Sequence, residues 1–337
     1  DWRTDLYSNS EEVLTLSEKS PGTIVISGPL IGHHHKRFSD SYEVVYSDKK
    51  VMHQEEFNES IQEACAAIVM TSITVSPQVI DSAPNLKILS NCGVGYDNIE
   101  HQYARDKGIL VTNTPDVLTT SCAELGVALV MATARRLAEG FRLIENNEFS
   151  GWKIDLLLGS ELCGKTLGIF GCGRIGQAMV RIIKGFGMNI IYHNRRKLSS
   201  EMEADLGMRY VGFKDLISLS DVLVVTASLN RDNSHSFTLD NFRKMKRGSM
   251  LVNIGRGGII KESDLILALG EDLIAAVGLD VFETPHDIPL ELKTDPRVTL
   301  TPHIGSATLE ARESMSALAV DAVIDALCGT KPQYVVN

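Results

Sequence analysis

The sequence predicts an α/β fold made of two doubly wound parallel sheets, each covered by helices on both faces. Short apolar runs alternate with helix-patterned segments from about residue 23 onward, which is typical of βαβ units. A glycine-rich turn joins one of these runs directly to a helical segment near residue 171. The chain is 337 residues long, which exceeds the size of most single hydrophobic cores. We therefore expect two domains.

The apolar runs fall into two series, separated by a long helical segment. The first series predicts five strands, at residues 23–27, 42–46, 66–71, 87–91 and 109–113. One helix is then expected from about residue 119 to residue 146. The second series predicts six strands and a last helix, at residues 167–170, 189–192, 222–227, 250–254, 275–280, 298–301 and 308–327.

The most specific motif is the turn Gly171-Cys-Gly173-Arg174-Ile175-Gly176. An apolar run precedes it and an apolar-periodic segment follows, so it reads as strand, tight turn and helix. In a Rossmann-like domain the first glycine permits the turn, the second lets the backbone approach a pyrophosphate, and the third lets helix and strand pack closely. The helix N-terminus directs free N–H groups at the anion. These residues therefore predict a dinucleotide site.

The position of the last helix suggests how the two domains are connected. It follows the completed second sheet, so the economical interpretation returns it to the first. We predict a discontinuous substrate-binding domain, residues 1–118 with 304–337, interrupted by a dinucleotide-binding domain, residues 119–303. Ligands of such sheets bind at the carboxyl ends of the strands. The active site is therefore expected in the cleft between the domains.

The strand after the turn indicates which dinucleotide is bound. NAD sites usually place an acidic residue at the end of this strand, where it binds the ribose 2′-hydroxyl. Here Asn194 takes that position, and Arg195 and Arg196 follow. A neutral residue does not repel a 2′-phosphate, and two guanidinium groups can bind it. The alternative is a solvated basic turn. Given the spacing, we predict a preference for NADP(H).

Three later segments place reactive side chains at the ends of consecutive predicted strands. Arg256 follows the first of them, Asp280 and Glu283 follow the second, and His303 follows the third. A histidine can act as the acid/base, a carboxylate can fix its tautomer and raise its pKa, and an arginine can polarise a carbonyl group. Each residue alone has an ordinary structural explanation. Together, beside a nicotinamide, they predict proton and hydride transfer.

Composition and charge exclude several other classes of function. The formal net charge of −10 argues against a nucleic-acid or acidic-membrane partner. The six cysteines form no C-x-x-C pair, so neither a zinc site nor a disulfide framework is indicated. The tract His33-His34-His35 lacks a carboxylate or cysteine companion and is better explained as a solvated loop than as a metal site. We expect no metal.

The predicted cellular location rests on two features that the sequence lacks. The first twenty residues are polar and acidic, unlike a signal or transit peptide, and no apolar stretch reaches the roughly 18 residues that span a bilayer. The sequence therefore favours the cytoplasm.

In order along the chain, the motifs resemble those of the D-2-hydroxyacid dehydrogenase family. The resemblance implies that Arg256 binds the substrate carboxylate and carbonyl, and that His303 is the acid/base. It also implies that the N–H groups of Val94 and Gly95 cradle the carboxylate, that Asp280 holds the nicotinamide carboxamide, and that the protein is a homodimer. Within the family, the chain looks most like the NADP-preferring glyoxylate/hydroxypyruvate reductases. The motifs that carry the resemblance are the turn above and the segments 91–99, 113–117, 253–257, 279–282 and 301–306.

The sequence departs from this family in one place. Similar members carry Asp-Val-Phe-x-x-Glu-Pro, in which the glutamate orients the catalytic histidine. This chain reads Asp280-Val-Phe-Glu283-Thr-Pro285, which is one residue shorter. Glu283 could take over the role, and Asp287 is a weaker substitute. The alternative is that no carboxylate supports His303, which would lower the pKa of the imidazole and loosen its orientation.

The leading hypothesis is NADPH-dependent reduction of a small 2-oxo acid, glyoxylate or hydroxypyruvate first. The rival is a dinucleotide-sensing binding protein on the same scaffold, similar to the C-terminal binding protein corepressors, with weak or no turnover. The shortened loop keeps this rival open. The choice of 2-oxo acid depends on the loops around residues 70–74 and 152–158, whose shape the sequence does not define.

Overall fold

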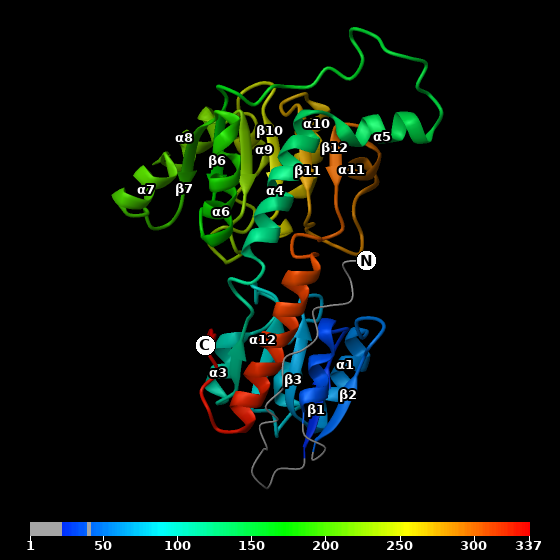
Figure 1. The fold of residues 1–337 in the computed structure, drawn as a ribbon, viewed down its shortest axis with the longest axis vertical. Helices are drawn as coiled ribbons and strands as arrows, with labels where there is room; N and C mark the ends of the chain where they lie inside the picture. The colour runs from blue at the N-terminus through cyan, green and yellow to red at the C-terminus, as the bar shows by residue number, and fades with distance from the viewer. Residues whose placement is uncertain (1–21, 39–41) are drawn as a thin grey trace, which may run out of the picture. The chain divides into compact units, whose positions relative to one another are not determined.

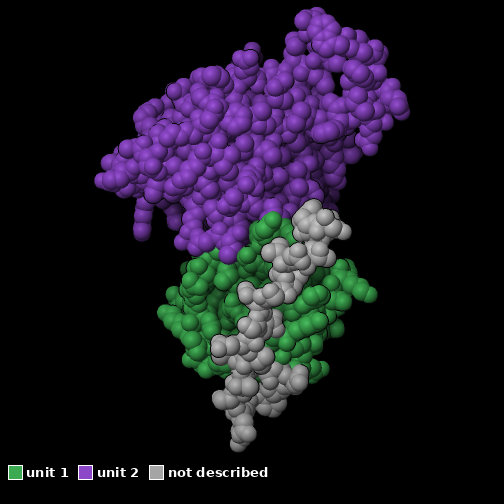
Figure 2. Space-filling model, viewed as in Figure 1, with its two compact units in different colours: residues 1–115, 309–337 green, residues 116–308 purple. Residues whose placement is uncertain are grey.

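The computed structural model describes residues 22–38 and 42–337. The chain divides into two compact units (Figure 2): residues 1–115 with 309–337 form unit 1, and residues 116–308 form unit 2. The sequence placed these boundaries after residue 118 and before residue 304, a few residues away. The segment from which the cytoplasm was inferred, the first twenty residues, lies outside the described residues.

Unit 1 contains a parallel sheet of five strands in the order β2-β1-β3-β4-β5 (Figure 1). The central strand β3 is buried along its whole length, as expected for a parallel strand covered on both faces. The strands are β1 (Thr23–Ile26), β2 (Glu43–Tyr46), β3 (Ala64–Met70), β4 (Ile88–Cys92) and β5 (Leu110–Thr112). The helices are α1 (Gln54–Ser60), α2 (Pro77–Asp81), α3 (His101–Asp106) and α12 (Leu309–Leu327), with 3-10 helices at Ile31–Arg37 and Ile61–Glu63.

The last helix belongs to the first sheet. The Ser90 hydroxyl on β4 donates a hydrogen bond to the main-chain oxygen of Ala319 on α12 at 3.0 Å, and both residues are buried. The last residue, Asn337, also returns to this unit, where its side chain accepts from the N–H of Val111 at 2.9 Å. The chain therefore leaves unit 1 once and comes back to it.

Unit 2 contains a parallel sheet of seven strands in the order β12-β11-β10-β9-β6-β7-β8 (Figure 1). Chain order reverses between β6 and β9, which is the switch point at which such sheets bind ligands. The strands are β6 (Thr166–Phe170), β7 (Asn189–His193), β8 (Met208–Tyr210), β9 (Val222–Val225), β10 (Met250–Asn253), β11 (Ala276–Leu279) and β12 (Val298–Leu300). The helices are α4 (Thr119–Ala134), α5 (Leu137–Glu145), α6 (Arg174–Ile183), α7 (Ser200–Leu206), α8 (Phe213–Leu219), α9 (Leu239–Phe242), α10 (Glu262–Gly270) and α11 (Leu290–Thr294), with 3-10 helices at Lys184–Phe186 and Gly257–Ile259.

Both faces of the seven-stranded sheet are buried, as strand β9 shows. Val222 and Val224 join the apolar cluster on one face, and Leu223 and Val225 join the cluster on the other. Successive side chains of a strand point to opposite faces, so a run of four apolar residues implies helices on both sides. This burial explains why these strands read as continuous apolar runs rather than alternating ones.

The single helix expected over residues 119–146 is wrong. The structure has α4 and α5, and the break between them lies at Arg136, which adopts a left-handed backbone (φ 54°). Two guanidinium nitrogens of Arg136 donate to Glu139 at 2.8 and 2.7 Å. A bidentate pair of this kind stabilises the turn, which redirects the chain before α5 begins.

The other expected elements agree with the structure apart from one strand. All eleven predicted strands are present, with ends that differ by at most two residues, and the edge strand β8 was not predicted. The three histidines lie in a kinked 3-10 segment, Ile31–Arg37, in which His33 has a left-handed backbone with φ 56°. Among the described residues, no helix is long and apolar enough to cross a membrane.

Candidate active site

The glycine-rich turn of unit 2 has the geometry that its spacing predicts. Gly171 has φ 91°, and a Cβ atom there would lie 2.4 to 2.6 Å from Ala227, so only glycine fits. A Cβ at Gly176 would meet Thr226 and other side chains at 3.1 to 3.4 Å, which shows close helix–strand packing. A Cβ at Gly173 would meet nothing nearer than 3.9 Å. The backbone at Gly173, the N-cap of α6, is therefore open to a phosphate, and the residues present fit a dinucleotide.

The residues that follow Gly173 begin helix α6. Arg174 is exposed and its Nε lies 2.8 Å from Oδ1 of Asp116, while Ile175 is half-buried. The Arg174 guanidinium thus projects from the first turn of α6, where a pyrophosphate would be expected. Its ion pair with Asp116 lies at the protein surface, where such pairs contribute little stability.

The end of β7 lies against the turn, as the cofactor prediction requires. The main-chain N–H of Gly171 donates to the oxygen of His193 at 2.9 Å, and the side-chain amide of Asn194 donates to the oxygen of Cys172 at 3.1 Å. Arg195 and Arg196 are exposed, and no hydrogen bond or ion pair engages either guanidinium group within the described part of the chain. Both guanidinium groups after β7 are therefore available to bind an anion.

Arg256 follows β10, and the last residue of that strand holds its loop. The Asn253 side chain is buried; its amide donates to the main-chain oxygen of Arg256 at 3.0 Å, and its oxygen accepts from the N–H of Gly255 at 3.0 Å. The guanidinium of Arg256 donates to the oxygen of Gly255 at 3.0 Å. The loop therefore has a defined shape, which limits where the guanidinium can reach.

His303 follows β12, and a neighbouring carboxylate holds its loop. Asp280, 1% exposed at the end of β11, accepts three hydrogen bonds: from the Thr301 hydroxyl at 2.7 Å, from the N–H of Ile304 at 2.8 Å and from the N–H of Gly305 at 2.9 Å. His303 itself has a left-handed backbone, with φ 55°. A conformation that non-glycine residues rarely adopt needs support from its surroundings, and the bonds to Asp280 supply it.

The expected contact between Glu283 and His303 is absent. Among the described residues, both carboxylate oxygens of Glu283 have other partners: Oε1 lies 2.6 Å from Nε2 of His235, and Oε2 accepts from the N–H of Glu262 at 3.1 Å. The carboxylate of Glu283 therefore binds His235 and the start of α10 instead of the imidazole that it was expected to orient. The reason is local, because the N–H of Glu283 also donates to Oε1 of Glu262, at 2.6 Å, which fixes the residue beside the start of α10.

In unit 1, the loop after β4 contains two main-chain donors that have no partner among the described residues. Its carbonyl groups are tied down: the Asn91 amide donates to the oxygens of Gly93 and Gly95 at 3.2 and 2.8 Å, and the Asn113 amide donates to the oxygen of Val94 at 2.8 Å. In contrast, no described residue accepts a hydrogen bond from the N–H of Val94 or Gly95. Successive free N–H groups form a concavity that suits an anion.

Sequence reasoning missed the residues that shape these loops. Asn91 and Asn253 each occupy the same kind of position, a polar residue at or next to the end of a buried apolar strand, and that pattern could have indicated loop-holding side chains. His235 and Glu262 gave no such signal, because their partner Glu283 is 48 and 21 residues away. They are found only when the chain is folded.

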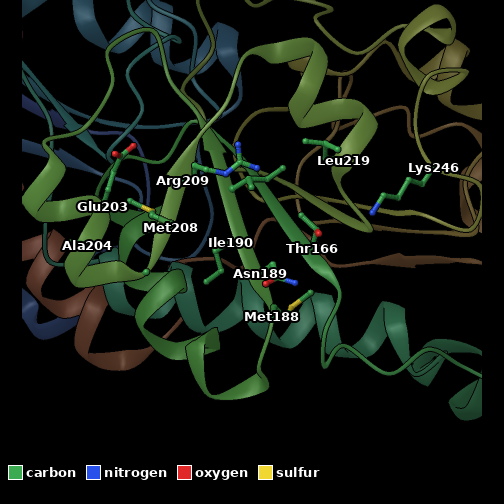
Figure 3. Close-up of a pocket in the computed structure, with 12 residues that line it drawn as sticks. Thr166, Met188, Asn189, Ile190, Glu203, Ala204, Met208, Arg209, Leu219 and Lys246 are labelled. Atoms are coloured by element: carbon green, nitrogen blue, oxygen red, sulfur yellow. The ribbon is translucent and has the colours of Figure 1, made fainter.

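A hollow of about 630 Å³ lies at the amino ends of strands in the seven-stranded sheet (Figure 3). It is lined by the first residues of β6, β7 and β8, namely Thr166, Asn189 and Met208. The reactive residues follow the other ends of the strands, and a parallel sheet brings those ends to one edge. The hollow is therefore separate from the candidate site. Within residues 22–38 and 42–337, no three His, Cys, Asp or Glu side chains are grouped to hold a metal ion.

In unit 2, then, the strand ends bring the glycine-rich turn, Asn194, Arg256, Asp280 and His303 to a single edge of one sheet. This arrangement defines a dinucleotide-binding Rossmann-like protein. A family model, the D-isomer specific 2-hydroxyacid dehydrogenase NAD binding domain, matches residues 127–305. The chain belongs to this family.

Relatives and solved structures agree with this assignment. A Staphylococcus aureus protein assigned to the 2-hydroxyacid dehydrogenases is 39% identical over 303 residues, which cover 90% of this chain and 95% of that protein. A glyoxylate reductase from Paecilomyes thermophila superposes with a TM-score of 0.84 at 29% identity, covering 94% of this chain and 99% of that one. An NADPH-dependent glyoxylate/hydroxypyruvate reductase from Sinorhizobium meliloti, solved with NADP and malonate, gives 0.82 at 29% identity, covering 94% and 97%.

Proposed function

We propose that this protein uses NADPH to reduce a small 2-oxo acid, glyoxylate or hydroxypyruvate, to the corresponding 2-hydroxy acid. The observation that carries the proposal is the placement of Arg256, Asp280 and His303 at the ends of consecutive strands, on the sheet edge that also carries the glycine-rich turn. The likeness to a Sinorhizobium meliloti reductase of glyoxylate and hydroxypyruvate supports the choice of substrate.

The preference for NADPH is supported by the end of β7. Asn194 is neutral and its amide is bound to the turn, so it presents no carboxylate to a 2′-phosphate. Arg195 and Arg196 are exposed and available in the described chain. Guanidinium groups bind phosphate through paired, charge-assisted hydrogen bonds. Bound NADPH would also lie along Gly173, Arg174 and Ile175.

The chain's own residues then divide the remaining work. When bound, NADPH supplies the hydride. Arg256 binds the carboxylate and polarises the carbonyl of the 2-oxo acid, and His303 delivers a proton to the carbonyl oxygen. The free N–H groups of Val94 and Gly95 bind the substrate carboxylate. Asp280 holds the loop of His303 and has lone-pair capacity left for the nicotinamide carboxamide.

We also propose that the protein is a homodimer, assembled through an apolar arm. We define this arm as residues 137–158, which comprise α5 and the chain after it. Figure 1 shows that the segment after α5 extends away from the sheet of unit 2. An exposed cluster of this size on one segment is typical of an interaction surface. The arm contains seven large apolar side chains that are 46 to 80% exposed: Leu137, Phe141, Ile144, Phe149, Trp152, Ile154 and Leu158.

The proposed activity is tested by steady-state oxidation of NADPH and of NADH over a panel of 2-oxo acids. We expect turnover of glyoxylate or hydroxypyruvate with a clear preference for NADPH. Binding of NADPH without turnover of any 2-oxo acid would favour the dinucleotide-sensing protein, which the absence of Glu283 from His303 supports. Equal use of NADH would reject the cofactor assignment alone. A cytoplasmic location stays a prediction.

A further inference from the structure

Glu283 joins three segments that are far apart in the sequence. Its Oε1 lies 2.6 Å from Nε2 of His235, and its Oε2 accepts from the N–H of Glu262 at 3.1 Å. Glu262 returns the contact, because its own Oε1 accepts from the N–H of Glu283 at 2.6 Å. An ionised carboxylate only accepts hydrogen bonds, so Nε2 of His235 carries the shared proton. We call these three side chains the Glu283 cluster.

The segment that the cluster holds is the one that carries Arg256. That segment runs from Ile254, after β10, to Glu262, the first residue of α10. A Cβ added at Gly257, next to Arg256, would lie 1.9 Å from the carbonyl group of Phe282, so the two backbones are in direct contact there. The arginine loop therefore packs directly on the backbone that leads into Glu283.

His235 fixes the same loop from its other side. Its main-chain N–H donates to the oxygen of Gly258 at 2.8 Å, and Phe237, two residues later, donates to the oxygen of Ile259 at 3.2 Å. The side chain of His235 binds Glu283, while its backbone binds the loop. The 3-10 turn after Arg256, Gly257–Ile259, is thus held between the His235 segment and the Glu283 segment.

The charges in the cluster also favour a specific role over an incidental contact. Glu262 is 6% exposed; burial, and then the charge of Glu283, raise its pKa, while the hydrogen bond from the Glu283 N–H opposes that shift. Two adjacent carboxylates repel one another. A donor on His235 offsets this repulsion, and Lys261 and Asp264 beside it form their own ion pair at 3.0 Å. Glu262 is the buried member of the cluster, whereas the side chains of His235 and Glu283 are 43 and 32% exposed. A polar cluster rigidifies the segments that it joins when the hydrogen bonds of its members are satisfied.

We propose that His235, Glu283 and Glu262 are positioning residues that fix the Arg256 loop for binding of the 2-oxo acid carboxylate. The inference rests on the proposed function. In this proposal Glu283 fixes the loop that carries Arg256, and it does not orient the proton-transferring His303. A guanidinium that binds a carboxylate with two bonds depends on its orientation, so loosening its loop weakens substrate binding more than it slows proton transfer.

The test compares Glu283→Ala, Glu283→Gln and His235→Gln with the wild type. We expect Glu283→Ala to raise the KM for glyoxylate about 10-fold or more and to change kcat by less than about 3-fold, the signature of lost substrate binding. The pH dependence of kcat should keep its position. Glu283→Gln retains an acceptor for the Glu262 N–H, so it should recover part of the loss. The control is Glu291→Gln, which removes an exposed charge on α11 and should leave both constants unchanged.

A second readout does not depend on turnover. Amide hydrogen exchange over residues 254–262, measured on NADPH-bound protein without a 2-oxo acid, should become faster in Glu283→Ala and His235→Gln but not in Glu291→Gln. The proposal is overturned if exchange in Glu283→Ala and His235→Gln equals that of the wild type. It is also overturned if Glu283→Ala lowers kcat and shifts the pH profile, because that result would mean that Glu283 supports His303. If the wild type reduces no 2-oxo acid, the proposed function fails, and exchange alone decides whether the cluster holds the loop.

Discussion

Asp280 accepts a hydrogen bond from the main-chain N–H of Gly305 at 2.9 Å. The same carboxylate accepts from the Thr301 hydroxyl and from the N–H of Ile304, at 2.7 and 2.8 Å. His303 lies between these donors, in a left-handed conformation. One buried carboxylate therefore holds both sides of the backbone that carries the proposed acid/base.

This relationship predicts the effect of Asp280→Asn. A neutral amide offers one acceptor atom where the carboxylate offers two, so at least one buried donor of the loop loses its partner. That loss costs about 1–3 kcal/mol of unfolding free energy, measured by urea denaturation. We expect kcat to fall about 10-fold or more, because a misplaced reacting group is costly. Thr301→Val removes one bond and should have a smaller effect; wild-type turnover in Asp280→Asn would contradict the role.

His303→Ala tests the proposed proton donor. Without the imidazole, no side chain is proposed to protonate the carbonyl oxygen, so turnover should fall by about 10²-fold or more. The Kd for NADPH, measured by fluorescence titration, should stay near that of the wild type. A variant that retains both its rate and its pH profile would remove His303 from the reaction.

The double variant Arg195→Ala, Arg196→Ala tests the cofactor assignment. Losing two charge-assisted phosphate contacts should weaken NADPH by on the order of 2–4 kcal/mol and leave NADH almost unaffected. Calorimetric titration of both dinucleotides measures the difference. Arg209→Ala, which removes an exposed cation in the middle of β8, is the matched control. Equal losses for NADPH and NADH would mean that the arginines do not read the 2′-phosphate.

The apolar arm predicts the assembly state. Trp152→Glu places a charge on a side chain that is 80% exposed in a single chain and is proposed to be buried between two. Burying an unpaired charge is costly. The dissociation constant of the dimer, measured by sedimentation equilibrium, should therefore increase by about 10²-fold. Leu290→Glu, an exposed apolar residue outside the arm, should have no effect. A monomeric wild type would refute the proposal.

Much of the fold could be predicted from the sequence because both faces of each parallel sheet are buried. Strands such as β3 and β9 are apolar along their whole length, so each stands out as a run between more polar segments. The edge strand β8 escaped prediction because it has three residues and its middle one, Arg209, is exposed. The break at Arg136 could not be predicted from the sequence either, because arginine is a good helix former. Only its ion pair with Glu139 in the folded chain reveals the turn.

The candidate site divides in the same way. The three glycines could be assigned from local spacing, because each role depends on the neighbouring strand and helix. Glu283 could not, because its partner was inferred from the position of a loop in related sequences. In the folded chain Oε1 of Glu283 lies 2.6 Å from Nε2 of His235, which is 48 residues earlier. Contacts of this kind depend on the folded arrangement of strands and not on sequence distance.

The most direct test of the proposed reaction follows the hydride itself. NADPH that carries deuterium at the transferable C4 position is mixed with glyoxylate or hydroxypyruvate, and the product is analysed by mass spectrometry. We expect one deuterium at C2 of the 2-hydroxy acid, formed in a one-to-one ratio with NADP and strongly reduced in His303→Ala. Binding of NADPH without labelled product from any 2-oxo acid would contradict the proposal and identify a protein that keeps the dinucleotide site without the reaction.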